Sequence, residues 1–168
     1  MKSLIIIQVF IAFFAGLTAL FLMYKSMNYF MKKKFEIEEA NSAFAVLQVG
    51  ILFATSFIMS SVLTAAINAV QFLNTGSSFQ LNSVLTSITY IVIFTIIGML
   101  FTFAVIFSSV FIFFQLTHIN EWEQIKLNNI PTSLISAALI LGLALIMDDY
   151  IGHLCEALIP YPETIQIR

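Results

Sequence analysis

Near the end of the chain, side chains that can bind metals or carry protons lie close together: Asp148, Asp149, His153, Cys155 and Glu156. If one helix runs through them, Asp149, His153 and Glu156 share a face at i, i+4 and i+7, and carboxylate and imidazole groups are ligands for divalent metals. The spacing is compatible with a metal site but not specific for one. We therefore expect a solvated helix end with an ion pair between Asp149 and His153, and no metal or other cofactor.

A second group of polar side chains recurs every four residues within an apolar run: Ser56, Ser60, Thr64 and Asn68. On a helix this interval produces a slowly winding stripe. Such a stripe either packs against another helix, where small residues let backbones approach closely, or lines an aqueous path. We favour packing, because no charged residue lies within the stripe.

Two charged phrases, "FEIEEAN" at 35–41 and "EWEQIKLNN" at 121–129, each precede an apolar run. Acidic side chains near the start of a helix favour its dipole, and Asn is a good cap for the free amide groups there. We interpret both phrases as helix starts at a membrane surface, with a docking surface for a soluble protein as the alternative. The candidate partner contacts are Glu36, Glu39, Asn41, Trp122, Glu123 and Asn129.

The elements that position these residues follow from composition, since 60% of the residues are hydrophobic and only 10% are charged. No charged residue occurs between Glu39 and Glu121. A bilayer core of about 30 Å requires about 20 apolar helical residues. The sequence therefore predicts an all-α membrane protein in the lipid bilayer, with four transmembrane helices at Leu4–Met23, Ser42–Ala69, Leu85–Phe114 and Pro131–Met147, the middle two separated by a turn at 74–78.

The lysines predict the orientation in the membrane. Lys25, residues 32–34 and Lys126 lie in the connections after the first and third helices, whereas only Lys2 and Arg168 lie at the other side. Positive residues prefer the cytoplasmic side. Both termini are therefore predicted outside the cytoplasm and both charged connections inside.

The two halves of the chain repeat each other. A shift of 88 positions places Asn41 on Asn129 and Met59 on Met147, with apolar residues aligned between them. We interpret residues 1–73 and 79–159 as two parallel two-helix repeats, followed by an extended tail at 160–168. The repeats differ at one end, where Asp148 and Asp149 replace two serines.

The phrases "FEIEEANSAFAVLQVGILF" at 35–53, "AAINAV" at 65–70 and "NEWEQIKLNN" at 120–129 resemble the DUF350 family, which is named for a domain of unknown function. The resemblance covers nearly the whole chain. It implies four transmembrane helices in tandem two-helix repeats and a location in the bacterial inner membrane. It implies no established activity and no catalytic residues.

Two functional hypotheses remain, because enzyme motifs are missing from the sequence and a net charge of −2 does not favour nucleic-acid binding. One is a homo-oligomeric membrane scaffold that recruits a cytoplasmic protein partner through the charged connections. The other is an oligomeric channel for ions or small solutes, in which Asp148 and Asp149 form an outer ring that attracts cations. We prefer the scaffold, because ion-coupled transporters usually keep a charge near the bilayer midplane.

Overall fold

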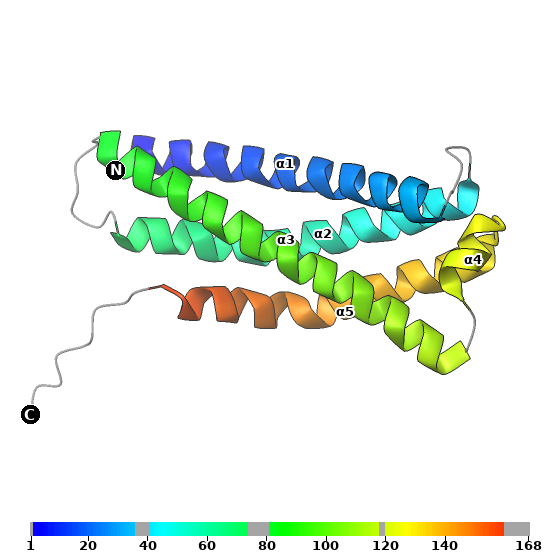
Figure 1. Cartoon of the computed structure of the whole chain (residues 1–168). Helices are drawn as coiled ribbons and strands as arrows, with labels where there is room; N and C mark the ends of the chain where they lie inside the picture. The colour runs from blue at the N-terminus through cyan, green and yellow to red at the C-terminus, as the bar shows by residue number, and fades with distance from the viewer. Residues whose placement is uncertain (1, 36–40, 74–80, 118–119, 160–168) are drawn as a thin grey trace, which may run out of the picture.

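The computed structural model describes residues 2–35, 41–73, 81–117 and 120–159, which contain helices and no strand (Figure 1). This confirms the predicted all-α class. The helices are α1 (Lys2–Phe35), α2 (Ser42–Leu73), α3 (Leu81–Thr117), α4 (Glu121–Lys126) and α5 (Ile130–Ala157).

Four of the described helices, α1, α2, α3 and α5, are long and apolar enough to cross a membrane, as in a multi-pass membrane protein. Each contains one predicted transmembrane span. The helices are longer than those spans, however. The helix α1 continues to Phe35, so the lysines at 32–34 lie on the same helix as the first span and not in a separate connection. The backbone amides beyond the apolar stretch keep their hydrogen bonds within the continued helix, so no loop is required there.

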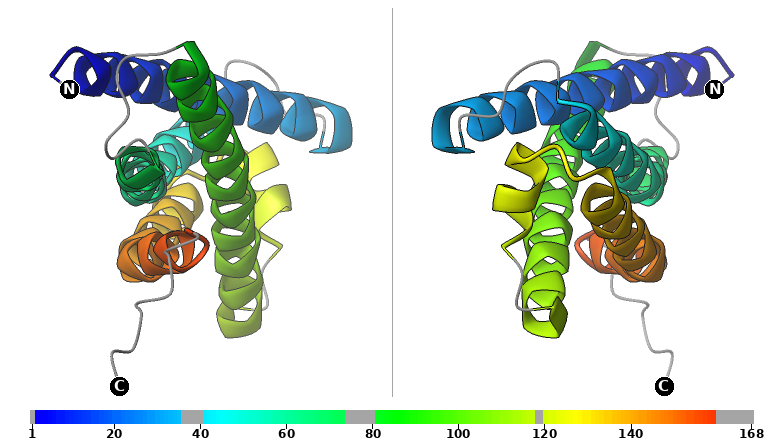
Figure 2. Two further views of the ribbon diagram at one scale, coloured as in Figure 1. Left: turned by 90° about the vertical axis from the view of Figure 1, so that its left-hand side faces the viewer. Right: turned by 90° about the vertical axis from the view of Figure 1, so that its right-hand side faces the viewer.

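The helix α2 is the centre of the bundle. It contacts every other described helix, and α2 and α3 separate α1 from α5, which make no contact with each other in the described chain (Figure 1). The end-on views show α3 crossing the other helices (Figure 2). Half of the most apolar window of α2 is buried, compared with 17% for α1. The first helix is therefore the most peripheral of the four.

The most extensive packing joins α2 to α5, the second helices of the two predicted repeats. At Gly50 an added Cβ would lie 2.7 Å from the Cβ of Ala137 and 2.9 Å from its Cα, so the two backbones touch. Gly152 approaches Ser61 in a similar way near the other end. Small residues permit such close helix packing without a large apolar side chain between the backbones.

The repeat boundaries stay a prediction. The predicted turn at 74–78 and the predicted tail at 160–168 lie outside the described residues.

Candidate partner-docking site at the α4 end

Asn41 joins the start of α2 to the end of α4. Its Oδ1 accepts a hydrogen bond from the backbone N–H of Phe44 at 2.8 Å, which is the bond of an N-cap residue. Its Nδ2 donates to the carbonyl oxygens of Ile125 at 2.7 Å and Lys126 at 3.4 Å. One buried amide therefore satisfies a free donor of one helix and also bonds to the last carbonyl oxygens of another.

Asn128 makes the reciprocal connection. Its Oδ1 accepts from the backbone N–H of Ala43, in the first turn of α2, at 2.9 Å. Its φ of 60° lies in the left-handed region, which Asn tolerates better than most residues with a side chain. This conformation turns the chain sharply between α4 and α5 and lets its amide N–H donate to the carbonyl oxygen of Ile125 at 2.9 Å.

A third bond connects α2 directly to α5. The buried hydroxyl of Ser133 donates to the carbonyl oxygen of Ala43, one residue after the start of α2. The Gly50 and Ala137 contact follows along the same pair of helices. The starts of α2 and α5 are thus held together by hydrogen bonds, and a close apolar contact follows further along both helices.

Asparagines also cap α4 and α5. Asn129 Oδ1 accepts from the N–H of Thr132 at 3.3 Å, and its Nδ2 donates to Gln124 Oε1 at 2.8 Å. Asn120 caps α4 with a longer bond of 3.5 Å from the N–H of Glu123. The short helix α4 is consequently bound at both ends by side-chain hydrogen bonds.

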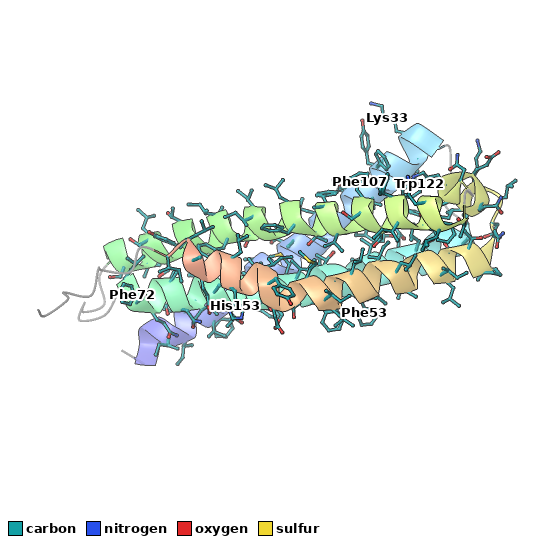
Figure 3. All side chains as sticks on the ribbon, turned by 90° about the horizontal axis from the view of Figure 1, so that it is seen from below. Lys33, Phe53, Phe72, Phe107, Trp122 and His153 are labelled. Atoms are coloured by element: carbon teal, nitrogen blue, oxygen red, sulfur yellow. The ribbon has the colours of Figure 1, made fainter. Side chains whose placement is uncertain are left out.

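Trp122 packs α4 against α1. Its ring packs edge-to-face on Phe30 of α1 at 6.3 Å between centroids, and Phe30 packs similarly on Phe107 of α3 at 6.3 Å. Figure 3 shows Phe107 and Trp122 beside each other near the end of α1. Such aromatic pairs each contribute about 0.5–1.5 kcal/mol beyond the burial of their area.

Glu121 is buried in the first turn of α4, with only 2% of its surface exposed. Neither carboxylate oxygen has a hydrogen-bond partner within the part of the chain that the structure describes. Burial raises the pKa of this carboxyl above 4.5, and the nearby hydroxyl of Ser136 lowers the pKa by a smaller amount. That hydroxyl donates to the carbonyl oxygen of Thr132 at 2.9 Å, so burial is the dominant influence on the pKa of the carboxyl group.

The family profile described as Domain of Unknown Function (DUF350) matches residues 1–151, which include α1 to α4 and most of α5. The chain belongs to the DUF350 family. This confirms the resemblance drawn from the repeated phrases. No curated protein and no solved structure matched the chain.

The predicted partner contacts of this DUF350 chain divide into three groups. Asn41 caps α2 and Asn129 caps α5, and each also bonds to α4, Asn41 through the carbonyl oxygens of Ile125 and Lys126 and Asn129 through Gln124. Trp122 is partly buried and Glu123 is exposed. Glu36 and Glu39 lie outside the described residues.

Three members of the polar stripe of this DUF350 chain lie along the seam between α1 and α2, whereas the fourth, Asn68, contacts Glu156 of α5. Ser56 and Thr64 donate their hydroxyl protons to carbonyl oxygens of their own helix, those of Leu52 at 2.9 Å and Ser60 at 2.8 Å. Ser56, Ser60 and Thr64 are exposed and line a mostly apolar cavity. Whether the stripe serves helix packing or lines a path stays a prediction.

The outer end of α5 differs from the prediction. His153 Nδ1 lies 3.6 Å from Glu156 Oε2, and the predicted Asp149–His153 ion pair is absent from this described segment. Asn68 Nδ2 of α2 donates to the other carboxylate oxygen of Glu156, Oε1, at 3.5 Å. No group of three His, Cys, Asp or Glu side chains among the described residues is placed to hold a metal.

Asp148 and Asp149 do not share an environment. Asp148 is partly buried, and its Oδ1 has no hydrogen-bond partner among the described residues, whereas Asp149 is exposed. Adjacent helix positions point about 100° apart, so only one of the two can face the bundle.

The pH dependence of the α4 end tests the burial of Glu121. Because the pKa of this carboxyl is raised on folding, the folded state retains a proton that the unfolded state releases above about pH 4.5. Stability therefore falls as the pH rises through this window and stays reduced above the folded pKa. We expect Glu121→Gln to abolish that slope and to raise the thermal midpoint at about pH 8 in mild detergent. Glu123→Gln, on the exposed side of the same helix, is the control and should leave the slope unchanged; equal slopes in all three proteins would contradict a buried Glu121.

Proposed function

We propose that this protein is a non-enzymatic membrane scaffold that assembles into a homo-oligomer and recruits a soluble protein partner at its α4 end. The observation that carries the proposal is the pair of reciprocal bonds between the repeats. Asn41 of the first repeat binds the last carbonyl oxygens of α4, and Asn128 after α4 binds an amide of α2. These bonds hold α4 against the start of α2, although their partners are 84 or 85 residues apart in the sequence.

These bonds fix α4 while its outer face stays accessible. Leu127, which directly follows α4, is 70% exposed, and Glu123 is exposed on the same helix. A rigid surface loses little conformational entropy when a partner binds, so more of the contact energy appears as affinity. An exposed leucine held in this way favours an apolar anchor for a partner, with the charge of Glu123 beside it.

The lysines support a cytoplasmic position for this end. Lys25, Lys32 and Lys33 lie toward the C-terminal end of α1, which is at the same end of the bundle as Lys126 of α4 (Figure 1). By the preference of positive residues for the cytoplasm, α4 faces the cytoplasm of a bacterium, and the chain lies in its inner membrane with both termini outside.

The stripe on α2 favours the scaffold over the channel. The hydroxyl groups of Ser56 and Thr64 donate hydrogen bonds to carbonyl oxygens of their own helix, and the cavity that these residues line has mainly apolar walls. Water and ions gain few hydrogen bonds from such a surface.

Site-specific cross-linking in growing cells tests the docking surface. A photoreactive amino acid replaces Leu127 in the full-length chain, and the same amino acid replaces Leu145 as the control, because Leu145 is 55% exposed on the apolar part of α5. We expect a discrete adduct with one soluble protein from position 127 and none from position 145. Identical adducts at both positions, or none at 127, would contradict a docking surface at α4.

The oligomer is tested separately by the native mass of the purified protein in nanodiscs. We expect a defined number of copies and no ion flux above that of empty liposomes. A monomer would refute the homo-oligomer, and a reproducible ion current would support the channel.

A further inference from the structure

The short helix α4 is held differently at its two ends. At the C-terminal end, Asn41 of the α2 start donates to the carbonyl oxygens of Ile125 at 2.7 Å and Lys126 at 3.4 Å. Asn129, which caps α5, donates to Gln124 Oε1 at 2.8 Å. Hydrogen bonds from the starts of two other helices therefore fix this end.

The contacts at the N-terminal end of α4 are of another kind. The Trp122 ring packs edge-to-face on Phe30 of α1, at 6.3 Å between centroids. Asn120 caps the helix through a long bond of 3.5 Å to the N–H of Glu123, and this bond lies within α4 and does not reach another helix. Ring packing is thus the contact that positions this end against the bundle.

A cavity of about 330 Å³ lies between the N-terminal end of α4 and α3. Its walls are mostly apolar, and they are formed by Phe107, Val110 and Phe111 of α3 and by Asn120, Glu121 and Trp122. The packing on this side of α4 is therefore incomplete, and the atoms that line the cavity lack contacts that would hold the helix in place. This end can move at a smaller cost than a fully packed helix.

Glu121 lies at this loosely packed end. Both of its carboxylate oxygens are buried and have no hydrogen-bond partner among the residues that the structure describes. A neutral carboxyl group tolerates such a place far better than an ionised one, which requires a partner or water. Ionisation of Glu121 therefore favours a movement that brings its side chain into water. The backbone that must move with it is the end of α4 that ring packing holds.

The helices around α4 bring few ionisable groups to Glu121. The whole of α2 and the part of α5 before Asp148 have none, and Tyr90 is the single one in α3. At this end of the bundle, α1 contributes Tyr24, Lys25, Tyr29 and the lysines at 32–34. None of the described groups is a hydrogen-bond partner of the Glu121 carboxylate. The surroundings of this carboxylate are therefore set by burial.

Two further ionisable groups share α4 with Glu121. At about 100° per residue, Glu123 and Lys126 lie roughly 160° and 140° around the helix from Glu121, and both are exposed. His118 and the glutamates between positions 36 and 39 lie outside the described residues. His118 is close to Glu121 in the sequence, so the experiment below includes it.

We propose that α4 is a pH-operated switch. While Glu121 carries a proton, the N-terminal end of α4 stays docked, and when the carboxyl ionises this end swings outward about the hydrogen-bonded Lys126 end, which separates Trp122 from Phe30. Because burial raises the pKa of Glu121 above 4.5, the docked form is the low-pH form and opening occurs as the pH rises through the raised value. The switch is a property of α4 itself, so it holds or fails independently of partner docking.

The fluorescence of Trp122, the single tryptophan of the chain, tests the switch in the full-length protein in nanodiscs. We expect the emission to shift to longer wavelength and acrylamide quenching to increase between about pH 5 and about pH 9, with unchanged helix content by circular dichroism. Glu121→Gln should keep the low-pH emission throughout. Glu123→Gln, on the exposed side of the same helix, should retain the transition.

Three results of this experiment would overturn the switch. The first is an emission that does not change with pH, or a transition that persists in Glu121→Gln. The second is a transition that His118→Gln removes and Glu121→Gln does not, which would assign it to the histidine. The third is a loss of helix content at the same pH, which would mean that the whole bundle unfolds.

Distances between spin labels test the pivot and do not depend on the folding of Glu121→Gln. In a Cys155→Ala background, one label is placed at Leu145 of α5 and the other at Asn120 or at Leu127, which flank α4; all three labelled positions are exposed. We expect the distance from Asn120 to change as the pH rises and the distance from Leu127 to stay constant. Equal changes at both positions would refute the pivot, and constant distances at both would refute the switch.

Discussion

Replacement of Gly50 by Val lowers the free energy of unfolding by about 3 kcal/mol, at the upper end of the cost of overpacking a core. The reason is the contact between α2 and α5. The first added carbon already lies 2.7 Å from the Cβ and 2.9 Å from the Cα of Ala137, and a backbone atom cannot move aside as a flexible side chain can. The helices must separate, which weakens the most extensive contact in the bundle. Thermal unfolding in mild detergent, followed by circular dichroism, measures this loss.

Gly142 provides the matched control for this substitution. It lies in α5, and an added Cβ would meet no atom within 4 Å, so Gly142→Val should change stability by less than about 0.5 kcal/mol. Adding Ala137→Gly to Gly50→Val should restore part of the loss, because it removes the closer of the two clashing atoms but leaves the Cα in place. A Gly50→Val protein as stable as Gly142→Val would show that the α2–α5 seam is looser than described.

Replacement of Asn41 by Leu is the second large effect, with an expected cost of about 2–4 kcal/mol. The substitution removes the N-cap of α2 and leaves the carbonyl oxygens of Ile125 and Lys126 without the amide that binds them. Because Asn41 is only 8% exposed, water does not readily replace those bonds. The measurement is backbone hydrogen exchange, in which the amides of α4 should exchange faster than in the unaltered protein.

Asn120→Ala controls for the loss of an asparagine cap in general. Its bond to the N–H of Glu123 is long, at 3.5 Å, and the residue is exposed, so the expected cost is about 0.5 kcal/mol. If Asn41→Leu and Asn120→Ala accelerate exchange in α4 equally, the bonds from Asn41 to α4 contribute nothing beyond a local cap.

The architecture could be predicted from composition because a bilayer leaves few alternatives to long apolar helices. The caps at Asn41 and Asn129 could also be predicted, since capping depends on residue type and on the start of an apolar run. The bonds from Asn128 and Ser133 could not, because they depend on how α2 and α5 approach each other. Their only signals in the sequence were a second Asn before Asn129 and a serine in the first turn of α5.

The roles of the acidic residues were the least predictable. Glu121 and Glu123 look equivalent in "EWEQIK", yet the first is buried and the second exposed. On a helix of six residues, too few positions exist for a periodic pattern to indicate the inner face. The predicted Asp149–His153 pair was wrong, because His153 lies beside Glu156, three residues later on α5, and Asn68 of α2 also donates to that carboxylate.

The length of α3 makes the bundle sensitive to bilayer thickness. At about 1.5 Å per residue, its 37 residues extend roughly 55 Å, which exceeds the 40–45 Å of a typical membrane with its headgroups. At Gly98 this helix is packed closely on α2, where an added Cβ would lie 2.7 Å from the sulfur atom of Met59. A thinner membrane forces α3 to lean further, and α2 must follow because the two helices touch there. A change in the tilt of α3 therefore also shifts α2, which contacts every other described helix.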